Sequence, residues 1–254
     1  MNERIFLMSK TTRLDKFVSG LKKDLSRSGV KLLCKQKRIT VNGECAKPDQ
    51  KIDAESDEVC LDGERLVFKE HIYIMLNKPS GYVCSTRDGK SPTVLELVPD
   101  RLYRKGLFPA GRLDKDTEGF VLITDDGKLS HAMLSPKHHV PKKYYVELKD
   151  PISQDTDEKF SNGIEIDGGD ICKPAILERI KDKPHACYLT ICEGKYHQIK
   201  RMFSAVGNEV VYLKRIAIGD MVLDENLPLG ECLEILHKDI RKLLVIFESH
   251  GKVS

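Results

Sequence analysis

The sequence lacks several features that would assign a class of protein at once. No apolar stretch approaches the length of a membrane-spanning helix. The opening segment, Met1–Met8, is too short and turns polar too quickly for a signal peptide. The eight cysteines are scattered and form no Cys-x-x-Cys pair, which argues against zinc and redox motifs. We therefore expect a cytoplasmic protein with reduced thiols and no membrane partner.

Several widespread catalytic motifs are also missing. The sequence has no Gly-x-x-x-x-Gly-Lys-Ser/Thr loop, no His-Glu-x-x-His and no Gly-x-Ser-x-Gly. These absences argue against a P-loop nucleotide site, a zinc protease and an α/β-hydrolase. His138 and His139 have no further ligands at metal spacing, so we interpret them as a solvent-exposed loop pair and predict no metal site.

The charge is unevenly distributed along the 254 residues, although the net charge is only +3. Between Lys10 and Lys51 there are 12 Lys and Arg residues against 4 Asp and Glu residues. The following segment, Ile52–Leu66, carries six acidic residues and one Arg. A compact basic patch points to a polyanion, most simply a nucleic acid. The alternative is a solvated, charged helix face.

The first part of the chain has a regular pattern. Apolar residues recur at helical spacing from Leu14 to Leu21, and a second helix is predicted over residues 27–36. A strand follows at Ile39–Val41, and Asn42-Gly43 is a strong hairpin-turn signal.

Residues 11–67 resemble the S4 RNA-binding domain. The matching motifs are Arg-Leu-Asp-Lys-Phe at 13–17, Lys-Gln-Lys-Arg at 35–38 and Ile-Thr-Val-Asn-Gly at 39–43. The resemblance implies a two-helix surface that grips structured RNA through its phosphates, which agrees with the charge count. The basic residues that we assign to this surface are Arg13, Lys16, Arg27, Lys31, Lys35, Lys37 and Arg38.

A glycine-bracketed loop, Gly111–Gly119, dominates the middle of the chain. It precedes the apolar run Phe120–Ile123, which is rich in β-forming residues and ends at Asp125-Asp126-Gly127. This pattern predicts a strand that is buried on both faces. Asp114 therefore lies in a loop fixed by a rigid strand, where reactive groups are commonly placed. By itself, such an Asp more often caps a turn.

The remainder of the chain predicts an α+β fold. A helix over about residues 196–206 would bury Ile199, Met202 and Phe203, with Lys200 and Arg201 near its first turns. Strands predominate and do not alternate regularly with helices, so we expect a mixed, largely antiparallel sheet.

Three segments together resemble the RsuA-type pseudouridine synthases. They are Gly-Arg-Leu-Asp at 111–114, Lys-Lys-Tyr-Tyr-Val at 142–146 and Glu-Gly-Lys-Tyr-His-Gln-Ile-Lys-Arg-Met at 193–202. The last segment is most similar to the members that act on small-subunit (16S) rRNA. The resemblance implies cofactor-free isomerisation of a flipped-out uridine in rRNA. The alternatives are a sister enzyme acting on 23S rRNA and a non-catalytic RNA-binding protein of ribosome assembly.

The resemblance also assigns roles to single residues. Asp114 would start the reaction, at a step that the sequence leaves open, and Lys200 would keep its carboxylate ionised. Tyr144 would stack on the flipped uracil. The residues assigned to RNA contacts or to support of the loop are Arg112, His197, Gln198 and Arg201.

We predict a small S4-like RNA-binding domain at residues 1–67, a linker at 68–71 and a pseudouridine synthase domain at 72–254. We expect a monomer without cofactors. Its partner would be rRNA, either naked or in a ribosome assembly intermediate.

Overall fold

The computed structural model describes residues 11–134 and 140–244, so the His138-His139 pair lies outside the described residues. The chain forms two compact units. The smaller unit takes in the described residues as far as His71, together with the segment Pro99–Leu107. The larger unit contains Ile72–Val98 and the described residues from Phe108 onward.

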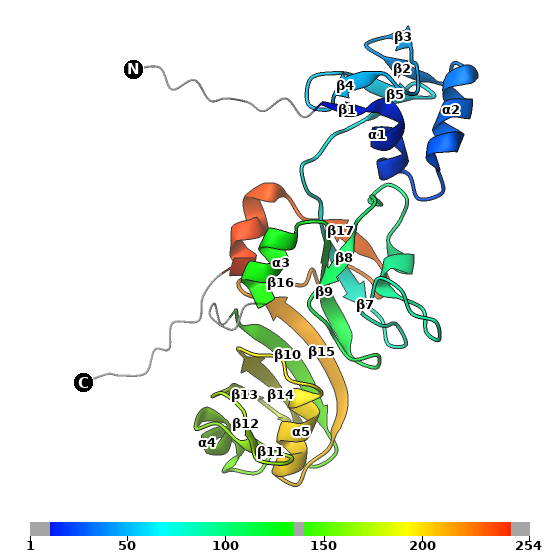
Figure 1. The fold of residues 1–254 in the computed structure, drawn as a ribbon. Coiled ribbons are helices and arrows are strands. Elements are labelled where there is room, and N and C mark those ends of the chain that lie inside the picture. The colour runs from blue at the N-terminus through cyan, green and yellow to red at the C-terminus, as the bar shows by residue number, and fades with distance from the viewer. Residues whose placement is uncertain (1–10, 135–139, 245–254) are drawn as a thin grey trace, which may run out of the picture. The chain divides into compact units, whose positions relative to one another are not determined.

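The smaller unit packs two helices against short antiparallel strands. Four of its strands form a sheet in the order β3-β2-β5-β6, while β1 pairs with β4. The elements, visible in blue and cyan in Figure 1, are β1 (Thr11–Arg13), α1 (Leu14–Leu21), α2 (Arg27–Lys35), β2 (Ile39–Val41), β3 (Glu44–Cys45), β4 (Lys51–Asp53), β5 (Val59–Leu61) and β6 (Glu64–Leu66).

Local sequence signals explain these elements. The Ser26 hydroxyl caps α2 by accepting the Gly29 backbone N–H at 3.1 Å. Asn42 and Gly43 both have positive φ, 52° and 83°, as a tight hairpin turn requires, so the predicted β2–β3 turn is confirmed. The apolar faces of both helices meet the sheet in one core.

The larger unit is built on one nine-stranded sheet (Figure 1). The strands are β7 (Tyr73–Lys78), β8 (Phe108–Ala110), β9 (Glu118–Thr124), β10 (Lys142–Leu148), β13 (Ile176–Ile180), β14 (Lys183–Ile191), β15 (Val210–Ile218), β16 (Met221–Val222) and β17 (Cys232–Glu234). Their main order is β13-β14-β10-β15-β9-β7-β17, with β16 beside β15 and β8 beside β9. Among the described strands of this sheet, β15 and β9 are the one parallel pair, and the other pairs are antiparallel. The predicted mixed, largely antiparallel sheet is therefore confirmed.

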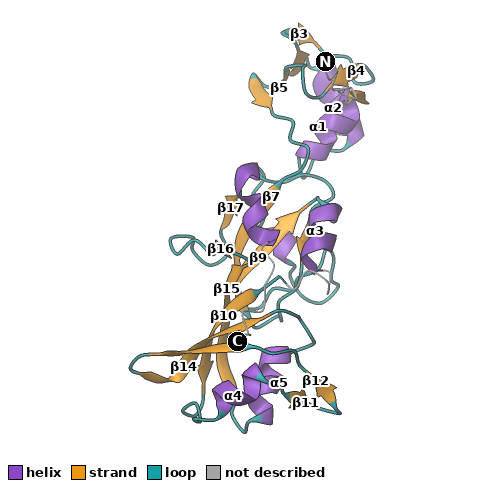
Figure 2. Ribbon diagram, turned by 90° about the vertical axis from the view of Figure 1, so that its left-hand side faces the viewer, coloured by secondary structure: helices purple, strands orange, loops and turns teal. Residues whose placement is uncertain are grey.

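The remaining elements of this unit lie beside the sheet, and Figure 2 shows α4 and α5 near β14 and α3 nearer β9. They are η1 (Val94–Leu97), α3 (Gly127–Leu134), α4 (Thr156–Ser161), α5 (Gln198–Ala205), η2 (His237–Leu244) and a small hairpin of β11 (Glu165–Ile166) and β12 (Asp170–Ile171). Phe160 of α4 and Phe203 of α5 pack edge to face, with ring centroids 5.1 Å apart.

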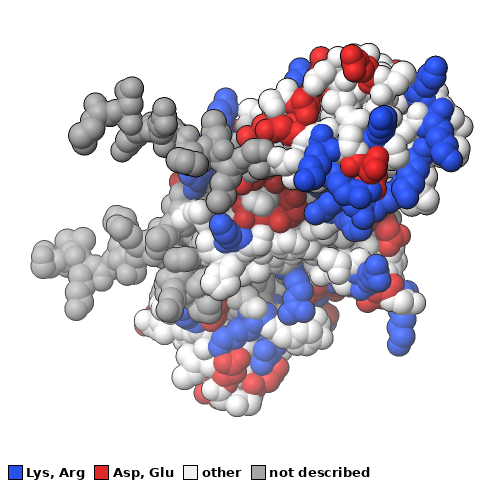
Figure 3. Space-filling model, turned by 45° about the horizontal axis from the view of Figure 1, so that its top comes forward, with Lys and Arg blue, Asp and Glu red and all other residues white. Residues whose placement is uncertain are grey.

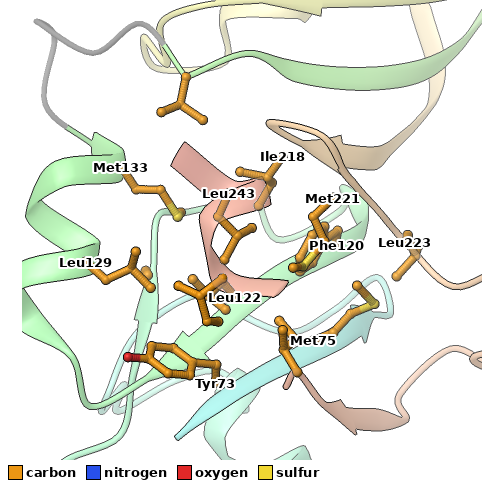
Figure 4. Close-up of a cluster of buried hydrophobic side chains, with 14 residues drawn as sticks. Tyr73, Met75, Phe120, Leu122, Leu129, Met133, Ile218, Met221, Leu223 and Leu243 are labelled. Atoms are coloured by element: carbon orange, nitrogen blue, oxygen red, sulfur yellow. The ribbon is translucent and has the colours of Figure 1, made fainter. Parts of the chain in front are cut away.

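A second group of buried side chains fixes the other end of the sheet. Figure 4 shows Phe120 and Leu122 of β9 surrounded by Met133 of α3, Ile218 of β15 and Leu243 of η2. Phe120 through Ile123 are all fully buried, so the predicted strand with two buried faces is confirmed. This strand holds the preceding loop on a rigid base.

The contact between β9 and β15 requires a glycine. Gly119 pairs with Arg215, and a Cβ atom at Gly119 would lie 2.2 Å from the Arg215 carbonyl oxygen. Gly119 also has a φ of 99°, which a residue with a side chain rarely adopts. No other residue can therefore occupy this position without moving one of the two strands.

We predict that Gly119→Ala lowers the free energy of unfolding by more than about 2 kcal/mol, because it adds both a backbone clash and an unfavourable φ. Gly89→Ala is the control, since an added Cβ there has no atom within 4 Å, and its effect should stay within about 0.5 kcal/mol. Thermal and urea unfolding would measure both. Equal stability of the two variants would contradict the prediction.

Candidate active site

The loop between β8 and β9 presents Asp114 to a pocket. The backbone N–H of Thr117 donates to the Asp114 carbonyl at 3.2 Å, which closes a turn within the loop. Leu113 and Thr117 are buried, whereas the Asp114 side chain is 26% exposed. The carboxylate can therefore meet a ligand although its loop is anchored on either side.

Lys78 supports this loop through hydrogen bonds to its backbone. Its side chain is fully buried, and its Nζ donates to the carbonyl oxygens of Pro79 at 3.1 Å, Lys115 at 3.1 Å and Thr117 at 2.7 Å. Burial lowers the pKa of this lysine, although Cys84 and nearby carboxylates oppose that shift. Lys78 therefore acts on the shape of the Asp114 loop.

The three residues predicted to be catalytic line one pocket of 200 Å³. Asp114 comes from the β8–β9 loop, Tyr144 from the middle of β10 and Lys200 from the first turn of α5. Tyr144 is buried and forms part of the wall. The predicted RNA contacts Arg112, His197 and Gln198 also line this pocket, which we call the catalytic pocket.

Two carboxylates share the Lys200 ammonium group. Nζ of Lys200 lies 2.7 Å from both carboxylate oxygens of Asp116 and 3.7 Å from Oδ2 of Asp114. His197 Nε2 lies 3.7 Å from the other Asp114 oxygen. Burial raises the pKa of Asp116, but the hydrogen bond and charge of Lys200 outweigh it and lower this pKa. Sequence reasoning identified the Asp114–Lys200 pair and missed the closer contact with Asp116.

The entry to α5 has an unusual backbone. His197, directly before the helix, has a φ of 48°, which is uncommon for a residue with a side chain. Its ring stacks on Tyr196, with centroids 3.8 Å apart, and Tyr196 is 75% exposed. An exposed aromatic ring at the pocket rim is suited to base stacking. Sequence reasoning missed Tyr196, because exposure cannot be read from an aromatic residue in a motif.

Gln198 and Arg201 support the loops beside the pocket. Gln198 is buried, accepts the Lys195 N–H at 3.0 Å and donates to Glu193 at 2.7 Å. Arg201 donates to Asp167 and does not line the catalytic pocket. Their contacts fit loop support better than direct binding of RNA.

The basic residues predicted on the smaller unit are all exposed, but they differ in their ion pairs. Arg13 and Arg27 pair with the buried carboxylate of Asp15, and the hydrogen bond from Arg13 is the main cause of the lowered pKa of Asp15. Arg38 pairs with Asp62. Figure 3 shows Lys and Arg gathered on this unit. Of the seven predicted residues, the four lysines, Lys16, Lys31, Lys35 and Lys37, form no ion pair within the described part of the chain.

Neither a metal centre nor a membrane span is found in the described part of the chain. Its His, Cys, Asp and Glu residues form no group of three that could hold a metal ion. None of its helices has the length and hydrophobicity needed to cross a bilayer.

Comparison with known proteins identifies the family. The family model described as RNA pseudouridylate synthase matches residues 72–205, and the S4 domain model matches residues 12–59. The chain belongs to the RNA pseudouridylate synthase family. It is therefore an enzyme that carries an S4 domain ahead of the catalytic domain.

The similarity extends over nearly the full length of several bacterial proteins. The chain is 44% identical to an uncharacterised RNA pseudouridine synthase of Bacillus subtilis, over 91% of this chain and 98% of that protein. It is 44% identical to ribosomal small subunit pseudouridine synthase A of Haemophilus influenzae, over 91% of this chain and 99% of that protein. The protein of that name from Escherichia coli is 43% identical, over 91% and 100%. A crystal structure of a pseudouridylate synthase matches with 44% identity and a TM-score of 0.64, covering 91% of this chain and 99% of that one.

We predict that Lys78→Met lowers turnover by about 100-fold, because a displacement of about 1 Å in a catalytic group has an effect of this size. It should also lower the free energy of unfolding by about 1–3 kcal/mol, since buried carbonyl groups lose their donor. Release of tritium from 5-tritiated uridine in RNA, together with thermal unfolding, would measure both effects. Lys115→Met is the control, because the Lys115 side chain is exposed and donates to the Ser91 hydroxyl rather than to the backbone of the Asp114 loop. Similar losses in both variants would contradict the role given to Lys78.

Proposed function

We propose that this protein converts a specific uridine of small-subunit (16S) rRNA to pseudouridine, with Asp114 as the group that starts the reaction. The main support is that Asp114, Tyr144 and Lys200, from three separate elements, line one pocket. The 16S assignment rests on relatives named ribosomal small subunit pseudouridine synthase A, which this chain matches over 99% and 100% of their length.

The reaction breaks the C1′–N1 bond, turns the uracil, forms a C1′–C5 bond and removes the C5 proton. One ionised carboxylate can start it as a nucleophile or a base. Lys200 and His197 flank the Asp114 carboxylate, each with a nitrogen 3.7 Å from one of its oxygens, and the Lys200 ammonium group places a positive charge beside it. No cofactor is required by this chemistry.

The target base must leave the RNA stack to reach Asp114. Flipping a base costs a few kcal/mol. The Tyr144 ring lines the catalytic pocket and would stack on the uracil, which contributes about 1–3 kcal/mol. Arg112 is exposed at the same pocket and would occupy the gap or contact a phosphate. His197 also lines this pocket and would contact the RNA, whereas Gln198 and Arg201 would support the loops beside it.

The protein would work in the cytoplasm as a monomer, since one chain supplies every residue of the proposed site. Its S4 domain would hold the rRNA while the larger unit acts on the uridine. Comparing turnover on naked 16S rRNA and on a 16S assembly intermediate would identify the form of the substrate. Mapping pseudouridines in both rRNAs of a strain that lacks this gene would test the target, and loss of a 23S pseudouridine alone would overturn the 16S assignment.

We predict that Asp114→Asn abolishes tritium release from 5-tritiated rRNA while RNA affinity stays within about threefold, because Asn keeps the shape but cannot act as a nucleophile or base. Asp116→Asn is the matched control. It removes the closer Lys200 partner in the same loop and should retain activity within about tenfold of the wild type. The reverse result, an inactive Asp116→Asn and an active Asp114→Asn, would show that the reaction is assigned to the wrong carboxylate.

We predict that replacing Lys31, Lys35 and Lys37 together by Gln weakens rRNA binding and its dependence on salt. The slope of log affinity against log salt should decrease by about 0.7–0.9 for each phosphate that the protein no longer neutralises. Filter-binding titrations over a range of salt would measure the slope. The control removes three exposed lysines of the larger unit, by Gln substitution at 149, 181 and 183. Equal changes in both triple variants would contradict a specific role of α2 and the residues after it.

A further inference from the structure

A larger cleft lies beside the catalytic pocket. Its volume is 670 Å³, and it shares Arg112, Tyr144 and Gly194 with the catalytic pocket. We call it the second cleft. Because the same three residues line both spaces, the two spaces are neighbours. Pockets for small ligands are typically about 300–1,000 Å³, so the second cleft has room for a nucleotide.

One wall of the second cleft is apolar. Phe108 and Pro109 come from β8, Met133 and Leu134 from α3, and Ile218 from the end of β15. A nucleobase presents flat, weakly solvated faces to such a wall, and an aromatic ring among these residues allows stacking.

The wall of the cleft is positively charged where Lys142 of β10 and Arg215 of β15 line it. Lys142 is half-buried there, and its Nζ donates to the Val140 carbonyl at 3.0 Å. Arg215 is 2% exposed, and its Nη2 is buried without a hydrogen-bond partner. In the described part of the chain, neither Lys142 nor Arg215 forms an ion pair with a carboxylate. Two cations are thus held in the wall without a protein counter-charge, which is costly unless a ligand supplies one.

Other charged groups at the cleft do not cancel this charge. The Glu193 carboxylate lines the cleft but accepts the Lys173 N–H at 2.9 Å and the Gln198 amide at 2.7 Å. The pKa of Lys142 is lowered to about 8, first by burial and then by the charge of Arg215, against the opposing effects of Cys192 and Glu193. Repulsion by Arg215 thus outweighs attraction by Glu193, so an anionic oxygen is favoured at this end.

We propose that the second cleft binds the nucleotide that adjoins the target uridine, with its base against the apolar wall and its phosphate beside Lys142 and Arg215. This subsite rests on the proposed function, because it assumes that the catalytic pocket takes a flipped uridine of RNA. The enzyme would then draw two consecutive nucleotides out of the stack, and the identity of the neighbouring base would contribute to the choice of site.

The test compares two uridine trinucleotides, one with natural phosphodiester links and one with neutral methylphosphonate links. Isothermal titration calorimetry on the full chain measures both affinities. The wild type should bind the natural trinucleotide about tenfold more tightly, as expected for hydrogen bonds to a charged group. Lys142→Met should lose most of this preference, whereas Lys142→Arg should keep it because it keeps the charge.

Lys143→Met is the matched control. Lys143 is the next residue of β10, does not line the second cleft and pairs with Glu178. It should keep the full preference for the natural trinucleotide. A Lys142→Met variant with the wild-type preference, or a Lys143→Met variant with an equal loss, would overturn the subsite. Thermal unfolding of each variant identifies any loss that comes from a damaged fold.

The binding assay requires no turnover, so its failure can be separated from failure of the proposed function. If the wild type releases tritium from rRNA but Lys142→Met binds both trinucleotides as the wild type does, only the subsite is wrong. If the wild type releases no tritium from either rRNA, the proposed function is wrong.

Discussion

The parallel contact between β9 and β15 is the seam on which the larger unit depends. It joins β13, β14, β10 and β15 to β9, β7 and β17 through only two residue pairs, Glu118 with Lys214 and Gly119 with Arg215. The Arg215 side chain strengthens the seam, because its Nε donates to the Phe120 carbonyl at 2.7 Å and its Nη1 reaches the Arg112 carbonyl at 3.5 Å. The absence of a side chain at Gly119 is what allows this approach.

The proposed active site is assembled across this seam. Asp114 belongs to the β9 side, whereas Tyr144 and Lys200 belong to the β10 and β15 side. Neither side alone brings the carboxylate to its cation and its aromatic wall. Lys78 adds a second constraint, since it ties the Asp114 loop to the end of β7 through the carbonyl groups of Lys115 and Thr117. The site is thus rigid where the chemistry is proposed, and its exposed aromatic residue, Tyr196, lies at the rim.

The same seam accounts for the charge in the second cleft. Arg215 is buried because it must reach backbone carbonyl groups across the seam, and this leaves its positive charge beside Lys142 without a carboxylate partner among the described residues. A residue that stabilises the fold therefore also creates a positive potential next to the catalytic pocket. In the smaller unit, by contrast, carboxylates neutralise part of the positive charge. Asp15 and Asp62 pair with three of the predicted RNA-binding arginines, and the four predicted lysines are left to bind a polyanion.

Local structure and family membership were predictable from the amino-acid sequence alone. The apolar run Phe120–Ile123 predicted a doubly buried strand, and Asn42-Gly43 predicted a hairpin, because periodicity and turn chemistry act over a few residues. The order of the motifs along the chain predicted the α+β fold and the set of candidate residues. The partners of those residues, by contrast, follow from the tertiary structure. Lys200 lies closest to Asp116, and Arg201 donates to Asp167 of a neighbouring loop. The second cleft brings together Lys142 and Arg215, which belong to strands far apart in the chain. Such contacts depend on register and strand order across the whole sheet, which local sequence patterns do not encode.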